Sequence, residues 1–93
     1  MNFEEVLREI EKIKIKYKIP KVLLFGSRAR QDFQKNSDID LCVFGDDQIK
    51  EIFYKISNEI DDINTFYSFD ILFFDDIKNE KLKEDILKEG VEI

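Results

Sequence analysis

The sequence predicts an α/β domain in which helices pack against a three-stranded mixed sheet. Short apolar runs of strand length, bounded by Gly, Pro or Asp, alternate along the chain with longer segments in which apolar residues recur at helical spacing. Its 93 residues are 43% hydrophobic and 13% aromatic, a composition typical of globular proteins. We therefore expect one domain over residues 1–93, with a single core.

The first predicted element is a helix that begins after Asn2, a suitable N-cap, and carries Glu4 and Glu5 in its first turn. Its apolar stripe consists of Phe3, Val6, Leu7, Ile10 and Ile13. Pro20 ends this helix and starts the first strand, residues 21–25. A short helix then follows the turn at Gly26.

The second strand is predicted over residues 38–44, and Asp46 and Asp47 after it are typical of a helix start. One long helix should follow, with a stripe formed by Ile49, Ile52, Phe53, Ile56, Ile60 and Ile63. The third strand lies in the apolar run 66–74. The last helix, residues 79–88, should end at Gly90 as a C-cap, and residues 91–93 are either a short strand or a frayed end.

The turn between the first strand and the short helix has the features of a phosphate site. Gly26 has no Cβ, so the backbone can turn sharply and a bulky anion can approach. Ser27 offers a hydroxyl and opens a helix whose first N–H groups attract phosphate. Arg28 or Arg30 could bind phosphate in a bidentate way, and we favour Arg30. The alternative for either guanidinium is pairing with a neighbouring acid.

Two carboxylates open the second strand. Asp38 and Asp40 are two residues apart, so both should point to one face of the sheet, with Cα atoms roughly 6.5–7 Å apart, while Ile39 and Leu41 face the core. Protonation, a basic partner or a divalent cation can relieve the repulsion between such carboxylates, and an all-oxygen site suits Mg²⁺. Two metal ions can clamp the attacking and leaving oxygens of a phosphoryl transfer.

Asp70 is the candidate for a third carboxylate, from the third strand. It lies in the most apolar run of the chain, where burying an acid is costly, so we expect a neighbouring group to neutralise it. The purely structural alternative for the three aspartates is that they cap helices or pair with cations.

The pattern Gly26-Ser27, Asp38-Ile39-Asp40 and a later Asp70 resembles the nucleotidyltransferase superfamily that includes DNA polymerase beta. The short chain and the run 25–30 resemble more narrowly the minimal nucleotidyltransferases, the antitoxin partners of prokaryotic HEPN-domain toxins. The closing residues 86–93 are also similar to the end of that family. Many relatives have Gly where this chain has Gln31, which puts the path and the nucleotide contacts of loop 32–36 in question.

This resemblance implies a nucleotidyltransferase fold and an enzyme that moves AMP from ATP to a hydroxyl, by analogy a tyrosine of a HEPN toxin. It assigns Asp38, Asp40 and Asp70 to catalysis and to two Mg²⁺ ions. The candidate nucleotide-binding residues are Gly26, Ser27, Arg30 and Ser37. Two other functions stay open: a non-catalytic antitoxin or nucleotide sensor that acts by binding, and transfer to a small molecule such as an antibiotic.

The composition excludes several other functions. The net charge of −6 argues against direct nucleic-acid binding, although residues 1–37 carry +4 and residues 38–93 carry −10. No apolar stretch is long enough for a bilayer and the start is acidic, so we expect a cytoplasmic protein. With no His and one cysteine, Cys42, a zinc site is not expected, and Cys42 is either a small buried hydrophobe or a reactive thiol beside Asp40.

Overall fold

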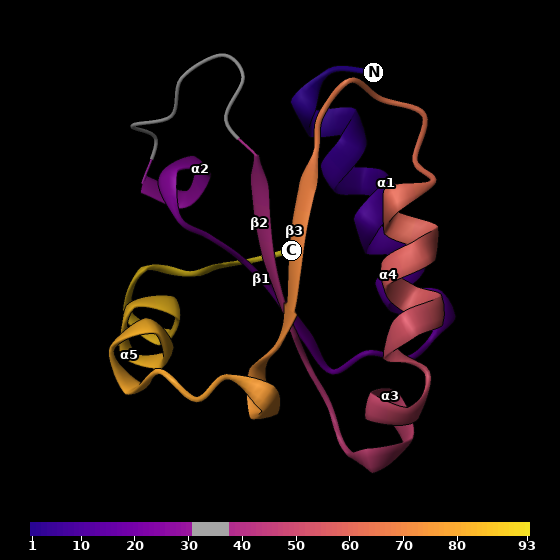
Figure 1. Ribbon diagram of the computed structural model, residues 1–93. Coiled ribbons are helices and arrows are strands. Elements are labelled where there is room, and N and C mark those ends of the chain that lie inside the picture. Colours follow the sequence, from indigo (N-terminus) through magenta and orange to yellow (C-terminus); the bar gives the residue numbers. More distant parts are fainter. Residues whose placement is uncertain (31–37) are drawn as a thin grey trace.

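The computed structural model describes residues 1–30 and 38–93, which form an α/β domain (Figure 1). The helices are α1 (Phe3–Lys16), α2 (Ser27–Arg30), α3 (Asp47–Glu51), α4 (Phe53–Asp61) and α5 (Glu80–Glu89), with a 3₁₀ turn, η1 (Phe74–Asp76). The strands are β1 (Lys21–Phe25), β2 (Ile39–Phe44), β3 (Phe69–Phe73) and β4 (Val91–Glu92). No helix in the described part of the chain is long and apolar enough to span a membrane.

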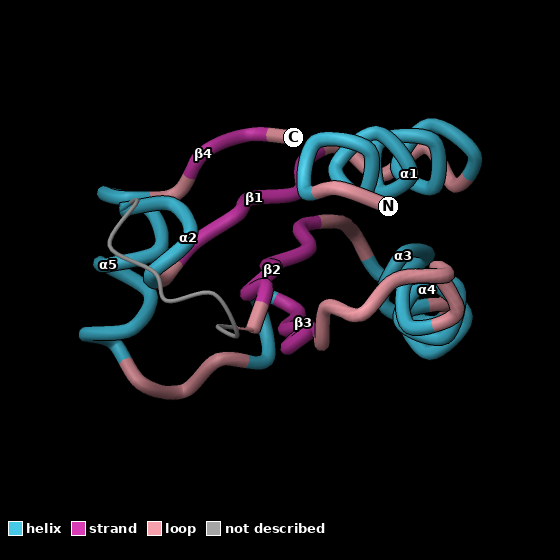
Figure 2. The backbone as a smooth tube through the Cα atoms, turned by 90° about the horizontal axis from the view of Figure 1, so that it is seen from above, coloured by secondary structure: helices cyan, strands magenta, loops and turns pink. Residues whose placement is uncertain are grey.

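The sheet is mixed, as predicted, but has four strands in the order β3-β2-β1-β4. β1 pairs antiparallel with β2 and with β4, whereas β2 and β3 are parallel. The added strand is β4, so residues 91–92 are a strand and not a frayed end. Figure 2 shows α1, α3 and α4 on one face of the sheet and α2 and α5 on the other.

The N-terminal helix forms as the sequence predicts. The side chain of Asn2 accepts a hydrogen bond from the Glu5 N–H, and Glu5 in turn accepts from the Asn2 N–H, a capping box that satisfies free donors at the helix start. Val6, Ile10 and Ile13 turn inward to the larger core, which also holds Val22, Leu24, Ile39, Leu41, Val43, Ile56 and Ile60. The burial of this apolar stripe is what holds α1 on the sheet.

Two elements differ from their predictions. The long helix is broken at Ile52, whose N–H bonds to the carbonyls of Ile49 and Lys50 in a tight turn. Both halves still direct buried isoleucines to the sheet, so periodicity alone does not detect the break. Gly90 does cap α5, but in an extended conformation (φ −65°). A Cβ there would lie 2.5 Å from the Ile86 carbonyl oxygen, so close packing explains this glycine.

Cys42 lies with Leu23, Phe25 and Ile86 in a second core between the sheet and α5, and its exposed fraction is 0%. Burial raises the pKa of its thiol to about 12. The thiolate is the reactive form of cysteine, so the geometry supports the buried-hydrophobe alternative.

We therefore expect Cys42 to resist a thiol reagent such as Ellman's reagent at about pH 8 in the native protein, since its pKa keeps it protonated and burial blocks access. The reaction should become fast in a denaturant that unfolds the chain, and its rate should follow the fraction unfolded. Rapid native-state labelling, measured by absorbance, would contradict the assignment.

Candidate active site

The sheet brings two of the three predicted carboxylates together. Asp40 on β2 and Asp70 on β3 are register partners in the parallel pair, so their side chains leave the same face of neighbouring strands. Such strands lie about 4.8 Å apart. Asp40 is half-buried and Asp70 is exposed. These two carboxylates therefore form the centre of the candidate site.

Asp38 lies immediately before β2 and is exposed. The strand thus begins one residue later than predicted. Ile39 and Leu41 are fully buried, with exposed fractions of 0%, on the opposite face from Asp40. The predicted alternation of Asp40 with the core-facing Ile39 and Leu41 is confirmed, and the shared face of Asp38 and Asp40 stays a prediction.

Gly26, in the turn between β1 and α2, lies against the carboxylate of Asp40. Its φ is +72°, in the left-handed region where a side chain is disfavoured. A Cβ at this position would overlap Oδ2 of Asp40. Ser27 then begins α2, directly after the turn. The backbone of Gly26 and the Asp40 carboxylate are consequently in direct contact, which only glycine permits.

Arg28 is buried, with 5% of its surface exposed, although it carries a charge. Its guanidinium carbon lies 5.2 Å from the ring centre of Phe3 and 5.0 Å from that of Tyr67. The two rings also meet edge to face, with centres 5.9 Å apart. Cation–π contacts of this kind are strongest when desolvated. Arg28 therefore attaches α2 to α1 and to the segment before β3, a role that sequence reasoning did not assign.

Asp70 differs from its prediction in its surroundings. We expected a buried acid that needs a neutralising neighbour, because the run 66–74 is apolar. In the structure β3 is an edge strand of the described sheet and the Asp70 side chain is exposed. Water solvates an exposed carboxylate, so no neutralising group is required.

Several predicted residues are not placed. Ser37, Gln31 and the loop 32–36 lie outside the described residues, and of Arg30 only the backbone is described. Among residues 1–30 and 38–93, no three His, Cys, Asp or Glu side chains converge closely enough to form a complete metal site. The predictions for these nucleotide contacts and for the metal ligands therefore stay predictions.

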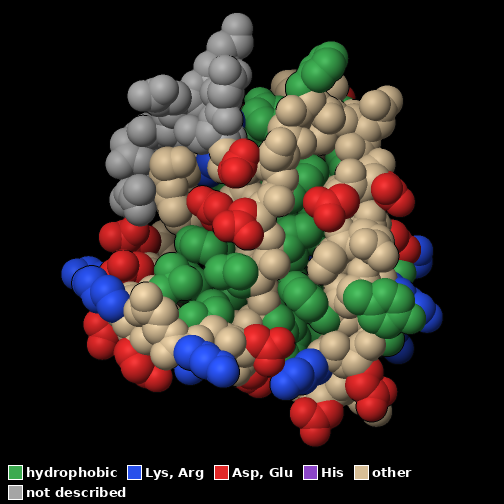
Figure 3. Space-filling model, viewed as in Figure 1, with side chains coloured by type: hydrophobic (Ala, Val, Ile, Leu, Met, Phe, Trp, Pro, Cys, Tyr) green, Lys and Arg blue, Asp and Glu red, His purple; other side chains and the backbone are tan. Residues whose placement is uncertain are grey.

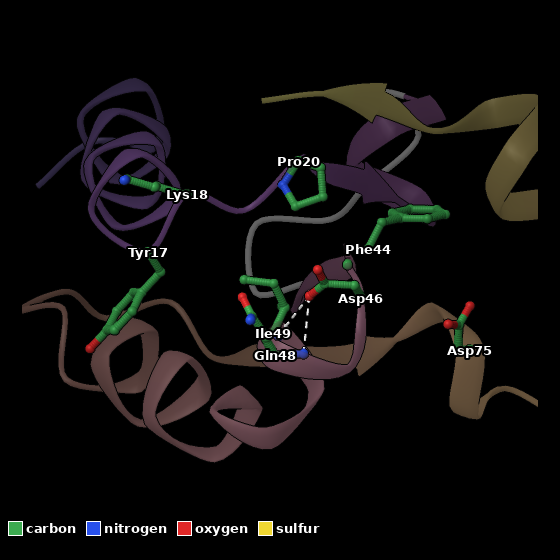
Figure 4. A pocket seen from close by; sticks show the side chains of 9 residues that line it. Tyr17, Lys18, Pro20, Phe44, Asp46, Gln48, Ile49 and Asp75 are labelled. Atoms are coloured by element: carbon green, nitrogen blue, oxygen red, sulfur yellow. Dashed lines mark hydrogen bonds between the residues drawn. The ribbon is translucent and has the colours of Figure 1, made fainter.

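The acids after β2 have a separate structural role, as the sequence indicated. Asp46 accepts hydrogen bonds from the N–H groups of Gln48 and Ile49 and so caps α3, beside a hollow of 630 Å³ (Figure 4). This hollow adjoins Phe44, which pairs with Lys21 at the opposite end of the β1–β2 ladder from Asp40. It is therefore distinct from the candidate active site.

The Gly26 turn thus packs on Asp40, and Asp70 is the register partner of Asp40 on the parallel strand β3. Residues 8–93 match the family described as "Polymerase beta, Nucleotidyltransferase". The chain belongs to this nucleotidyltransferase family.

Two relatives from Methanocaldococcus jannaschii, provisionally named protein adenylyltransferases, are similar in sequence. MJ0435 is 31% identical over 94 residues, which cover 100% of this chain and 99% of that protein. MJ0604 is 45% identical over 49 residues, covering 50% of this chain, and this chain spans only about half of that protein's length (49%).

Solved structures share the fold at low sequence identity. A minimal nucleotidyltransferase superposes with a TM-score of 0.66 and 20% identity, covering 100% of this chain and 97% of that chain. A toxin–antitoxin complex with AMP-PNP gives a TM-score of 0.62 and 21% identity over 91% of this chain and 69% of that chain. These likenesses establish the α/β nucleotidyltransferase fold.

Proposed function

We propose that this chain is a Mg²⁺-dependent protein adenylyltransferase that moves AMP from ATP to a tyrosine hydroxyl of a cognate HEPN-domain toxin and so acts as an antitoxin. The observation that carries the proposal is the contact of the Gly26 turn with Asp40, whose register partner is Asp70. Similarity to proteins named adenylyltransferases and to a toxin–antitoxin complex with AMP-PNP supports the donor and the partner class.

Different residues of the chain would bind the nucleotide donor, ATP, and the acceptor hydroxyl. The Gly26 turn and the first N–H groups of α2, with Ser27, would bind the triphosphate of ATP, as a helix start binds phosphate. Arg30 and Ser37 are the further candidates for triphosphate contacts. Asp70, exposed at the edge of the sheet, is accessible to a hydroxyl presented by another protein.

Asp38, Asp40 and Asp70 together would hold Mg²⁺, which prefers carboxylate, water and phosphate oxygens. The donor set fits that ion, and Asp38 and Asp70 are exposed, so packing does not fix the rotamers of their side chains. When bound, the ion neutralises phosphate charge and favours departure of pyrophosphate.

AMP transfer forms one bond at phosphorus and breaks another. The acceptor oxygen forms a bond to the α-phosphorus of ATP while the bond from that phosphorus to the bridging oxygen breaks, and pyrophosphate leaves. The hydroxyl proton passes to Asp70, which stands at the acceptor side, and from there to water. Alignment and charge stabilisation supply most of the rate in such a reaction, so few further side chains are required.

A second candidate function is neutralisation by binding alone, which the likeness to a toxin–antitoxin complex also favours. Mass spectrometry of the HEPN-domain protein mixed with this chain, ATP and Mg²⁺ separates the two. We expect a mass gain of one or more AMP units on that protein. A stable complex with no mass gain would favour inhibition by binding.

A further inference from the structure

β3 is an edge strand whose outer side is not paired within the described chain. Its only described partner is β2, and the Ile39 N–H donates to the Ser68 carbonyl at 2.9 Å. In a parallel ladder this bond directs the backbone groups of Asp70 and Leu72 toward β2 and those of Phe69 and Ile71 outward. Such an edge is a template for an additional strand.

Apolar surface lies at both ends of this edge. Figure 3, viewed onto β3, shows hydrophobic side chains across the middle of the face and Asp/Glu side chains above them. A hollow of 400 Å³ there is lined by Phe53, Ile71, Leu72, Ile77 and Leu82, among others. Phe66, three residues before β3, is fully exposed. Asp70 stands between these two apolar anchors.

The charges along the edge are uneven. Near the hollow, Lys50 pairs with Asp76 at 3.1 Å, and Lys78 lies on the rim, so acid and base are balanced there. Toward the other end of the edge, Asp70 on β3 and Asp38, which lies immediately before β2, are both exposed, so that end is acidic. The exposed ring of Phe66 suits a guanidinium, which can stack on its face, and the acidic end of the edge attracts the positive charge.

We propose that the β3 edge docks the protein acceptor as an extended segment, with apolar residues over the hollow, Arg or Lys beside Phe66, and the hydroxyl residue between them at Asp70. β3 spans about 13 Å at 3.3 Å per residue, so a segment of about six residues covers the surface. Main-chain pairing supplies affinity and the two anchors supply specificity. This inference rests on the proposed function and names its acceptor class.

The test uses labelled peptides of about ten residues. Each has a central Tyr with Arg on one side and alternating Val and Ile on the other, made in both chain directions. Matched peptides carry Glu in place of Arg, or Pro in the apolar half. We expect the Arg peptide, in one direction, to bind at least about tenfold more tightly than either matched peptide by fluorescence anisotropy. Equal affinities, or no binding of any peptide, would overturn the docking surface.

Variants of the chain locate the peptide. Ile71→Pro removes the outward N–H together with the Ile side chain, whereas Ile71→Ala removes the side chain and keeps the N–H. We expect the proline variant to bind the Arg peptide several-fold more weakly than the alanine variant, with circular dichroism confirming that both are folded. If the proline variant unfolds, Phe66→Ala tests the docking surface instead, because Phe66 is fully exposed and its loss should not unfold the chain. Its control is Ile15→Ala, at an exposed site on α1. Equal binding by Phe66→Ala and Ile15→Ala contradicts the proposal.

Mass spectrometry of the same mixtures with ATP and Mg²⁺ keeps the two proposals apart. Selective binding with no AMP on the peptide or on a HEPN-domain protein leaves the docking surface intact and overturns the transferase activity. AMP transfer to the HEPN-domain protein without peptide selectivity supports the transferase activity and overturns the docking surface.

Discussion

Replacing Asp38 and Asp40 together by Asn should lower the rate of AMP transfer by at least about a thousandfold, the scale expected when charge stabilisation at the reacting phosphate is lost. Asn keeps the size of Asp but cannot supply the negative oxygens that Mg²⁺ requires. The rate is measured from the mass-resolved fraction of modified acceptor over time. Thermal unfolding should stay close to that of the wild type, since Asp38 is exposed and Asp40 half-buried.

Asp46→Asn is the matched control for this variant. The same chemical change is made at the far end of β2, where Asp46 caps α3, and Asn is an equally good N-cap. We expect the control to keep both the wild-type rate and the wild-type stability. Transfer at the wild-type rate by the Asp38→Asn/Asp40→Asn chain would refute the assignment of these carboxylates.

Gly26→Ala should damage both the fold and the site. A left-handed φ of +72° costs an L-residue roughly 1–2 kcal/mol, which urea unfolding would measure. The new Cβ would also displace the Asp40 carboxylate, because an ideal Cβ on residue 26 overlaps Oδ2 of Asp40. A misplacement of about 1 Å can cost on the order of a hundredfold in rate.

Gly26→Asn separates these two effects. Asn adopts the left-handed conformation more readily than Ala but carries the same Cβ. We therefore expect the Asn variant to recover part of the lost stability while its transfer rate stays as low as that of Gly26→Ala. Recovery of the rate together with the stability would show that backbone strain, not contact with Asp40, explains the requirement for glycine.

Local signals predicted much of the fold and of the site. The Asn2 cap and the alternation of Asp40 with buried Ile39 depend on residues within one element, so the sequence alone indicates them. β4 was less certain because a two-residue strand is stable only when a partner, here β1, is already in place. The exposure of Asp70 likewise depends on which strand forms the edge of the sheet.

The choice between Arg28 and Arg30 as the phosphate ligand likewise could not be predicted from residues within one element. Both residues lie in one short helix, and nothing in their spacing distinguishes a phosphate ligand from a buried cation. What places Arg28 is contact with Phe3 and Tyr67, rings that come from residues 25 before it and 39 after it in the chain. Contacts over such separations leave no periodic signal in the sequence.

The cluster of Arg28 with Phe3 and Tyr67 also has a consequence for natural variation within the family. A buried guanidinium is costly to keep if either ring is lost, because a cation–π contact is lost while the charge stays desolvated. We expect positions 3, 28 and 67 to be inherited as a set, with relatives that lack the arginine also losing the aromatic pair. Natural variation at these three positions should therefore be correlated, whereas the exposed position 66 should vary independently of them.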